Sequence, residues 1–445
     1  MNNARILLPF LLLFLLPACS TVDKLTGQKK EEAPLPGERV SILELQKQLE
    51  PDDDALKAQG FISPSAWNNE FWPQGGGYPN HAMQNLAFTA DQPNKIWSAD
   101  TGEGSRKSLP LTAQPVIADN KIFTLDTESR LSAFSIEKGT LLWKANIRKK
   151  NEDDPVIGGG LSFSGGVLYA TSGYGELLAV NPDNGEIYWR ARLSAPSRAA
   201  PTIMDGRVFV SSLNNNVTAF DAKDGQLIWE YEGIGGNTSL LGSAACAADR
   251  EIAIAGFSSG ALHALRVENG STAWSDNLSG VSRAGGLSSL SDIRGLPVID
   301  KNLVIAISFG GKIVAIDKRT GQRVWQRDIA GAQTPWLAGN YVFILTSDNE
   351  VVALGRETGA IQWVSRLARY RNEKERSDPV SWTGPLLAGG RLIAFSDDGR
   401  AVEINPEDGS LLREWRTGHA IRIAPALAGG TLYLLAEDGS LLAFR

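Results

Sequence analysis

Residues 315–325 read AIDKRTGQRVW, the clearest copy of a phrase that recurs along most of the chain. The same frame of a small residue, an apolar residue, a turn and a tryptophan returns at 133–143, 179–189, 219–229, 264–274, 353–363 and, with two extra residues, 403–415. A period of about 40–50 residues that is rich in short strands is typical of a β-propeller. The repeat therefore predicts the architecture before any single residue indicates a function.

Each copy can be read as two strands joined by a tight turn. The apolar stretches that precede the phrase, such as 298–299 and 304–307, indicate short antiparallel strands. Asp317 is placed to accept hydrogen bonds from N–H groups of the turn, and Gly321 suits a position with positive φ. Because every repeat carries a tryptophan, we expect these side chains to pack as wedges between neighbouring blades rather than to form ligand-stacking platforms.

The number of repeats predicts how the ring closes. Seven units end in a tryptophan, and the last unit, 425–445, stops before one. Residues 95–97, which read KIW, are expected to supply the missing strand. The sequence thus predicts an all-β fold, an eight-bladed β-propeller of four-stranded antiparallel blades over residues 95–445, closed by pairing of the N- and C-terminal strands. The predicted structural tryptophans of the blades are Trp97, Trp143, Trp189, Trp229, Trp274, Trp325, Trp363 and Trp415.

The first residues are typical of a bacterial lipoprotein. One positive charge, a short apolar run and small residues predict a signal peptide over residues 1–18. The run is too short to span a bilayer comfortably. The sequence LPAC at 16–19 resembles a lipobox, which implies acylation of Cys19, including palmitate, and a stable anchor with no transmembrane helix. Ser20 follows where an aspartate would favour the inner membrane, so the resemblance implies the outer membrane, on the side that faces the periplasm.

Two segments separate this anchor from the ring. Residues 19–60 are polar and charged, which predicts a flexible tether, with a possible short helix near 40–49. Residues 61–94 include WPQGGGYP at 72–79, which is loop-like but aromatic. We expect this extension to pack on the propeller, because exposing its aromatic side chains to water is unfavourable. A clamp for a partner is the alternative.

The repeat phrase also resembles the tryptophan-docking motif of quinoprotein dehydrogenases, which are eight-bladed propellers that carry pyrroloquinoline quinone. That resemblance implies two adjacent cysteines above the quinone and carboxylates that hold calcium. The two cysteines of this chain, Cys19 and Cys246, are far apart, and Cys246 is read as a small core residue. His81, His263 and His419 have no metal-ligand spacing, and no hydrolase, nucleotide or zinc-protease motif is present. We therefore expect no enzyme, no cofactor and no metal.

A lipid-anchored propeller without catalytic residues resembles the BamB lipoproteins of the machinery that inserts β-barrels into the outer membrane. The resemblance covers the signal, the anchor and residues 95–445. It implies a non-catalytic scaffold that binds a periplasmic POTRA domain of BamA beside other assembly lipoproteins, with unfolded barrel substrates as a further partner. The formal net charge of -6 disfavours a nucleic-acid partner. A quinone-dependent dehydrogenase and a general envelope adaptor are the alternatives.

Two stretches carry the finer part of this resemblance. The sequence SLLG at 239–242 is similar to a family loop that reads Ser-Leu-Arg-Gly, and LSDIR at 290–294 is similar to Leu-Ser-Asp-Val-Asp. Those family loops contact the POTRA domain, so the resemblance implicates Leu240, Leu241, Asp292 and Arg294. Two positions depart from it, because Leu241 replaces an arginine and Arg294 replaces an aspartate. Ordinary connections between blades are the alternative, and the long Ser/Gly-rich stretch at 281–295 favours a functional loop.

A second unusual stretch, 366–378, holds arginines and lysine mixed with acidic residues. This mixture favours a solvated connection between two blades over a docking patch.

Overall fold

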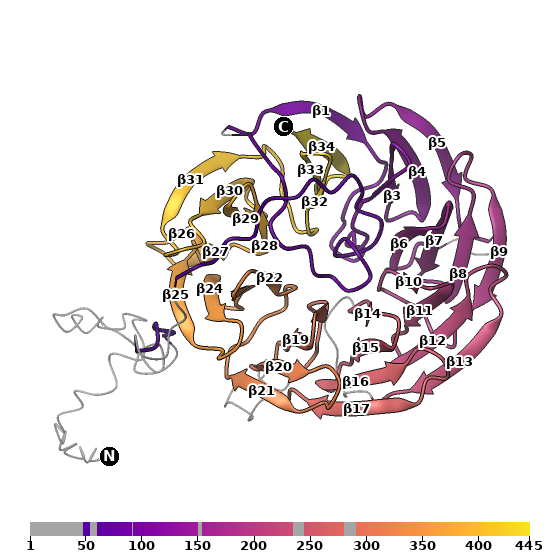
Figure 1. Ribbon diagram of the computed structural model, residues 1–445. Helices are drawn as coiled ribbons and strands as arrows, with labels where there is room; N and C mark the ends of the chain where they lie inside the picture. Colours follow the sequence, from indigo (N-terminus) through magenta and orange to yellow (C-terminus); the bar gives the residue numbers. More distant parts are fainter. Residues whose placement is uncertain (1–47, 54–59, 91, 150–153, 235–243, 280–290) are drawn as a thin grey trace, which may run out of the picture. The chain divides into compact units, whose positions relative to one another are not determined.

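Eight four-stranded antiparallel sheets follow one another around a ring, and the chain runs through them in order (Figure 1). The computed structural model describes residues 48–53, 60–90, 92–149, 154–234, 244–279 and 291–445. Within these residues all regular structure is β-strand, and no helix is long and apolar enough to cross a membrane. The predicted all-β, eight-bladed propeller is confirmed. Most of the possible helix near 40–49, together with the signal peptide and Cys19, lies outside the described residues.

The first four blades are built from consecutive strands. Blade 1 contains β2 (Val116–Ala118), β3 (Lys121–Leu125), β4 (Arg130–Ser135) and β5 (Leu141–Asn146). Blade 2 contains β6 (Gly159–Ser164), β7 (Val167–Ser172), β8 (Glu176–Val180) and β9 (Ile187–Arg192). Blade 3 contains β10 (Thr202–Met204), β11 (Arg207–Ser211), β12 (Asn216–Asp221) and β13 (Leu227–Glu232). Blade 4 contains β14 (Ala247–Ala248), β15 (Ile252–Gly256), β16 (Ala261–Arg266) and β17 (Thr272–Asn277).

The other four blades complete the ring. Blade 5 contains β18 (Val298–Asp300), β19 (Leu303–Ile307), β20 (Ile313–Asp317) and β21 (Arg323–Arg327). Blade 6 contains β22 (Trp336–Ala338), β23 (Tyr341–Leu345), β24 (Glu350–Gly355) and β25 (Ile361–Arg366). Blade 7 contains β28 (Trp382–Ala388), β29 (Arg391–Ser396), β30 (Arg400–Ile404) and β31 (Leu411–Arg416). Blade 8 contains β32 (Ala426–Ala428), β33 (Thr431–Leu435), β34 (Ser440–Phe444) and β1 (Lys95–Asp100).

Blade 8 closes the ring by joining strands from the two ends of the propeller. β1 pairs antiparallel with β34, and Trp97 lies opposite Ala443. Asn94 and Arg445 exchange two backbone hydrogen bonds of 2.9 and 3.0 Å beside this pair. The predicted closure by N- and C-terminal strands is therefore confirmed, and it leaves neither strand with an open edge at the seam.

A row of three side chains crosses most blades at the repeat phrase. In blade 1, Phe123 lies opposite Ala133, which lies opposite Trp143. The ring centroids of Phe123 and Trp143 are 6.1 Å apart, so the two rings meet above the alanine. Aromatic pairs at 5.7–6.0 Å repeat this arrangement in blades 2, 3, 6 and 8. The small residue of the phrase is needed because a larger one would separate the rings.

The tryptophans also lie against the turn of the next blade. Six indole N–H groups donate to a backbone carbonyl of that turn at 2.7–3.1 Å. The repeat glycine of the same turn lies under the ring. Gly185, for example, has φ 77°, and a Cβ on it would lie 2.8 Å from Cε3 of Trp143. The predicted positive φ is confirmed, and the neighbouring indole supplies a second reason for glycine.

Blade 7 departs from this pattern. Its register places Trp415 opposite Ala401, while Arg413 and Glu403 hold the positions of tryptophan and alanine in the other blades. Glu403 is 1% exposed, and both of its carboxylate oxygens accept 2.8 Å hydrogen bonds from Arg413. Trp415 donates to the same carboxylate at 3.1 Å and reaches blade 8 through Phe444, with ring centroids 5.2 Å apart. The two extra residues thus move this tryptophan along its strand.

Candidate functional site: a plugged central channel and its rim

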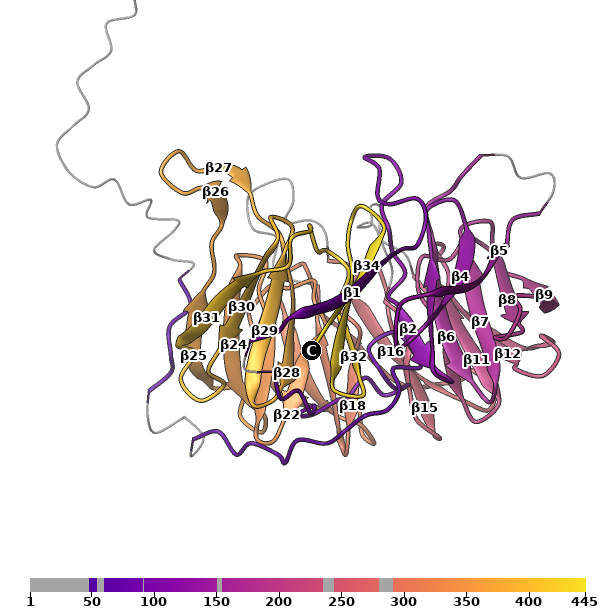
Figure 2. The ribbon, with the colours of Figure 1, turned by 90° about the horizontal axis from the view of Figure 1, so that it is seen from above.

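A segment ahead of the propeller, residues 69–86, follows the blades once around the channel; we call it the plug. It bonds to the innermost strand of every blade or to the turn next to it. The plug residues that make these bonds, in ring order from blade 8 to blade 7, are Asn69, Trp72, Pro73, Gln74, Pro79, Asn80, Gln84 and Leu86. Figure 2 shows the extension that contains the plug along one face of the ring. The channel is therefore closed on that face by backbone from outside the repeats.

The plug is tied down by both backbone and side chains. Trp72 exchanges two 2.9 Å backbone hydrogen bonds with Ile117 of β2. The side-chain amide of Gln74 bonds both backbone groups of Ile203 in β10, at 2.9 and 3.0 Å. Trp72 is 2% exposed and joins a large buried cluster of side chains from blades 1, 6, 7 and 8. These contacts make the plug part of the folded core.

His81 lies buried at the centre of the plug. Its Nδ1 lies 2.7 Å from the carbonyl oxygen of Pro297, so the neutral ring donates its Nδ1 proton to that oxygen. Burial lowers the pKa of His81 to about 4, and the bond to Pro297 only partly opposes this effect. The ring is therefore neutral at pH 7, consistent with the structural role expected of an isolated histidine.

The plug forms the floor of a cavity of about 380 Å³ along the channel axis. Residues from the connections into the inner strands line it, together with Gly75 of the plug. Its charged lining residues are Arg198, Arg294, Arg422 and Glu437. All eight blades contribute to this lining, so the cavity belongs to the ring as a whole.

The charged groups of the channel differ in how they are compensated. Arg422 Nη2 lies 2.8 Å from Oδ2 of the buried Asp397. Burial raises the pKa of Glu437, an effect that Arg422 partly offsets, and Ser105 donates to its carboxylate at 3.2 Å. Arg198 makes no hydrogen bond or ion pair within the described part of the chain, and its Nε is buried. Arg198 is therefore the least compensated charge in the cavity.

The residues implicated by the loop resemblance are not all brought together. Leu240 and Leu241 lie outside the described residues. Asp292 is 3% exposed and its backbone carbonyl accepts a 3.0 Å hydrogen bond from Phe309. Arg294, two residues on, lines the channel cavity, and the residue is exposed to solvent there. Desolvation lowers the pKa of Arg294, and Asp292 opposes this effect.

The stretch at 366–378 contains a hairpin of β26 (Tyr370–Asn372) and β27 (Ser377–Pro379), which rises from the face opposite the plug (Figure 2). Several of its charges are paired with the ring. Arg366 and Arg369 lie 3.3 and 3.9 Å from the buried carboxylate of Glu350, and Arg371 lies 3.5 Å from Asp397. These pairs account for much of the positive charge that the sequence places here.

The profile of the family described as outer membrane protein assembly factor BamB matches residues 82–163, 129–365 and 367–445, which is most of the chain.

The chain belongs to the BamB family.

Named members of the BamB family show the same relationship at low identity. The outer membrane protein assembly factors BamB of Yersinia pestis and Escherichia coli K12 are 24% and 25% identical to this chain; they cover 79% and 78% of it and 88% of their own lengths. The crystal structure of BamB from Moraxella catarrhalis is 21% identical, with a TM-score of 0.68 over 79% of this chain and 99% of that one. The resemblance noted in the sequence is confirmed, and the family is one of outer-membrane assembly factors.

The BamB-family propeller also shares its fold with a quinohemoprotein alcohol dehydrogenase of Pseudomonas putida HK5, which is 13% identical with a TM-score of 0.65 over 84% of this chain and 80% of that one. This similarity shows the fold alone. The residues do not fit a quinone site with calcium, since Cys246 is single and the described residues contain no group of three His, Cys, Asp or Glu side chains placed to hold a metal.

Cys246 lies in the core of blades 3 and 4, just ahead of β14. It is 1% exposed, and its Sγ lies 3.4 Å from Oγ of Ser211. Burial raises the pKa of the Cys246 thiol to about 11. The thiol is therefore protonated at pH 7 and unsuited to nucleophilic chemistry.

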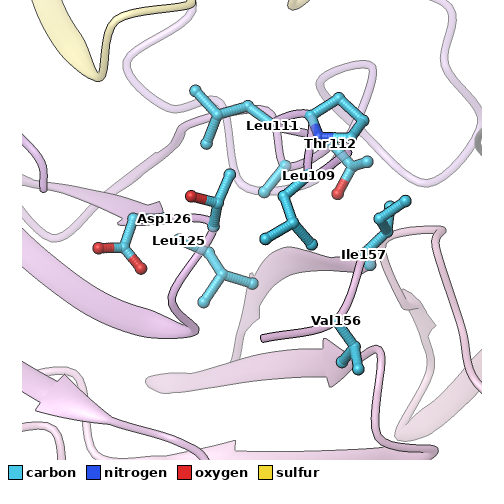
Figure 3. A pocket seen from close by; sticks show the side chains of 11 residues that line it. Leu109, Leu111, Thr112, Leu125, Asp126, Val156 and Ile157 are labelled. Carbon is cyan, nitrogen blue, oxygen red and sulfur yellow. The ribbon is translucent and has the colours of Figure 1, made fainter. Parts of the chain in front are cut away.

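A crevice between blades 1 and 2 is too small to be a second site in this BamB-family ring. Figure 3 shows the side chains that line it, among them the apolar Leu109, Leu125 and Ile157. The space between them is about 10 Å³. Asp126 borders it, but its carboxylate accepts hydrogen bonds from the backbone of Glu103, Glu128 and Arg130. That volume is about one water molecule, so the crevice is a packing gap.

Proposed function

We propose that this protein is a non-catalytic scaffold subunit of the outer-membrane β-barrel assembly machinery. It binds the POTRA region of a BamA-like barrel protein, works beside the other assembly lipoproteins, and aids insertion of barrel proteins. The observation that carries this proposal is the match of the BamB family profile to residues 82–163, 129–365 and 367–445. Acylation of Cys19 would hold the ring at the periplasmic side of the outer membrane, with residues 19–60 as the tether.

The partner-binding surface is proposed on the face opposite the plug. The inner strands β14 and β18 begin on that side, since the plug bonds at their other ends. Leu240 and Leu241 precede β14 in the sequence, and Asp292 and Arg294 precede β18. The plug covers the inner strands at the other face, which favours this side for docking. Because Asp292 is buried, its role is to hold its loop in place, and direct contact is assigned to Leu240 and Leu241.

Affinity capture tests both the role and the surface. The tagged, lipidated chain is isolated in mild detergent from native membranes and compared with the double variant Leu240→Glu and Leu241→Glu. A double variant Leu227→Glu and Ile228→Glu is the matched control, because those residues are 60% and 40% exposed on the outer strand β13. Two buried carboxylates in a docking surface are expected to abolish capture of the POTRA-containing protein, since each is costly to desolvate.

The outcomes separate the parts of this proposal. Capture by the parent and the β13 control, with loss in the loop variant, supports the role and the surface. Capture in all three forms keeps the role and moves the surface elsewhere. If the parent captures no barrel protein with POTRA domains, and porin levels are unchanged when the protein is removed, the role is that of a general envelope adaptor.

A further inference from the structure

Arg198 and Arg294 place two guanidinium groups in the central channel, and in the described residues neither is hydrogen-bonded to a carboxylate, although the charge of Asp292 acts on Arg294. A guanidinium enclosed by protein is unfavourable unless an anion or several acceptors surround it. The buried Nε of Arg198 has no acceptor at all. This unpartnered group is the feature of the channel that packing and ring closure leave unexplained.

The surroundings of Arg198 leave room for a ligand. Gly75 of the plug, Gly160, Ala200 and Ala245 line the same cavity and carry at most a methyl group. Gln333 and Thr334, of the connection into the neighbouring blade 6, add an amide and a hydroxyl group to the wall; the Gln333 amide donates to the carbonyl oxygen of Trp382 at 3.4 Å, and the Thr334 hydroxyl oxygen accepts from the backbone of Leu296. Two arginine forks with neutral donors match the shape of carboxylate and phosphate groups.

We propose that the central channel is a binding site for a small oxyanion, a carboxylate- or phosphate-bearing solute held by Arg198 and Arg294. This site goes beyond the partner-binding role proposed above: it shares Arg294 with the proposed docking connections, but it rests on Arg198 and the channel cavity, which that role does not use. The remaining charges set its position within the channel. Arg422 is already paired with Asp397, and Glu437 beside it repels anions. The ligand therefore lies on the side of blades 3 to 5, where the other two arginines enter.

The size of the cavity limits the ligand. A volume of about 380 Å³ is at the lower end of small-molecule pockets, which span about 300–1,000 Å³. The plug crosses one end of the channel, so a large polymer cannot pass through it. Solutes of the size of inorganic phosphate or citrate fit, and a sulfated polysaccharide does not.

Calorimetric titration of the purified full chain with inorganic phosphate and, separately, with citrate tests this site at constant ionic strength. We expect saturable binding at one site for at least one of the two anions. Arg198→Ala should weaken it about tenfold or more, and adding Arg294→Gln should remove it, because each arginine contributes charge-assisted hydrogen bonds. Arg198→Lys keeps the charge but loses the forked guanidinium group, so its affinity for the anion should lie between those of the parent and Arg198→Ala.

Arg250→Ala is the matched control, since Arg250 has an 82% exposed side chain in the turn between β14 and β15, does not line the cavity, and removal of its charge should leave binding unchanged. Binding of phosphate alone or citrate alone identifies the class of solute. The proposal is overturned if neither anion binds saturably. It is also overturned if Arg198→Ala and Arg198→Lys melt at the parental temperature and bind the anion as the parent does, or if Arg250→Ala weakens binding as much as Arg198→Ala. Full competition by dextran sulfate would place the anion on the outer surface and overturn it as well.

Discussion

Gly139 of blade 1 lies under the indole of Trp97 from blade 8, and a Cβ on this glycine would stand 2.5 Å from Cε3 of the ring. This contact lies between blades 8 and 1, beside the β1–β34 pair that closes the ring. The wedge tryptophan of one blade and the repeat glycine of the next thus act together, and the interface next to the closing strand pair uses them as the other interfaces between blades do.

Replacing this glycine should weaken the interface between blades 8 and 1. In Gly139→Ala the methyl group has to displace Trp97, and the backbone at φ 65° is strained as well. We expect a loss of about 2–4 kcal/mol in the free energy of unfolding, from overpacking added to the strain. Gly206→Ala is the control, because φ there is 74° and nothing lies within 4 Å of the added carbon. Urea unfolding should show a loss of about 1 kcal/mol in the free energy of unfolding for the control. Equal losses in the two variants would contradict the proposed packing of Trp97 against Gly139.

His81 predicts a loss of stability in acid. Its pKa is about 4 in the folded chain and about 6.5 when unfolded, so protonation favours the unfolded state. The contribution of neutral His81 to the free energy of unfolding is complete above about pH 6.5. It falls as the pH drops and is lost below about pH 4, for a total of about 3 kcal/mol. His81→Asn tolerates the positive φ of 60° and does not titrate. The stability of the parent should fall more steeply than that of the variant between pH 6.5 and 4; parallel curves would refute this.

The buried charges of blade 7 should behave as a unit. Glu403→Ala leaves Arg413 and Arg391 without the carboxylate that they share, at 2.8 and 3.3 Å, and should cost about 3–5 kcal/mol. Arg413→Leu in addition restores an apolar row beside β29, so the double variant should regain part of that loss. Chemical unfolding of the two single variants and the double variant measures the coupling, and strictly additive losses would show that the pair does not act together.

Cys246 should resist modification in the folded protein. Its burial and its thiol pKa of about 11 predict no labelling by iodoacetamide at pH 8 over hours. Mass spectrometry of the Cys19→Ser chain, which leaves this one thiol, should detect labelling only after unfolding in guanidinium. Rapid labelling of the native form would mean that the core of blades 3 and 4 opens readily.

The fold could be predicted because each blade repeats the same local solution. Asp317, Gly321 and Trp325 indicate a turn, a positive φ and a wedge in one phrase, and these signals agree with one another. The repeat phrase predicted the wrong strand register in blade 7. Counting back from Trp415 predicts that Trp415 lies opposite Glu403, whereas in the structure Arg413 lies opposite Glu403.

The channel was less accessible to sequence reasoning. The plug bonds to the ring mainly through backbone groups, which leave no residue pattern, and only its buried aromatics suggested that it packs. Arg294 drew attention as a departure from a family loop, whereas Arg198 carries no signal in the sequence. A guanidinium without a partner becomes visible only when the surrounding chain is in place.

The route of the plug has a consequence for the order of assembly. Residues 69–86 precede every blade in the chain, yet their bonds require all eight inner strands. The plug is therefore synthesised before the blades, but its hydrogen bonds can all form only after the last blade is in place. A ring that lacks even one blade leaves the plug incompletely hydrogen-bonded and exposes its aromatic residues. Proteases and chaperones can then recognise an incompletely folded chain by this exposed segment.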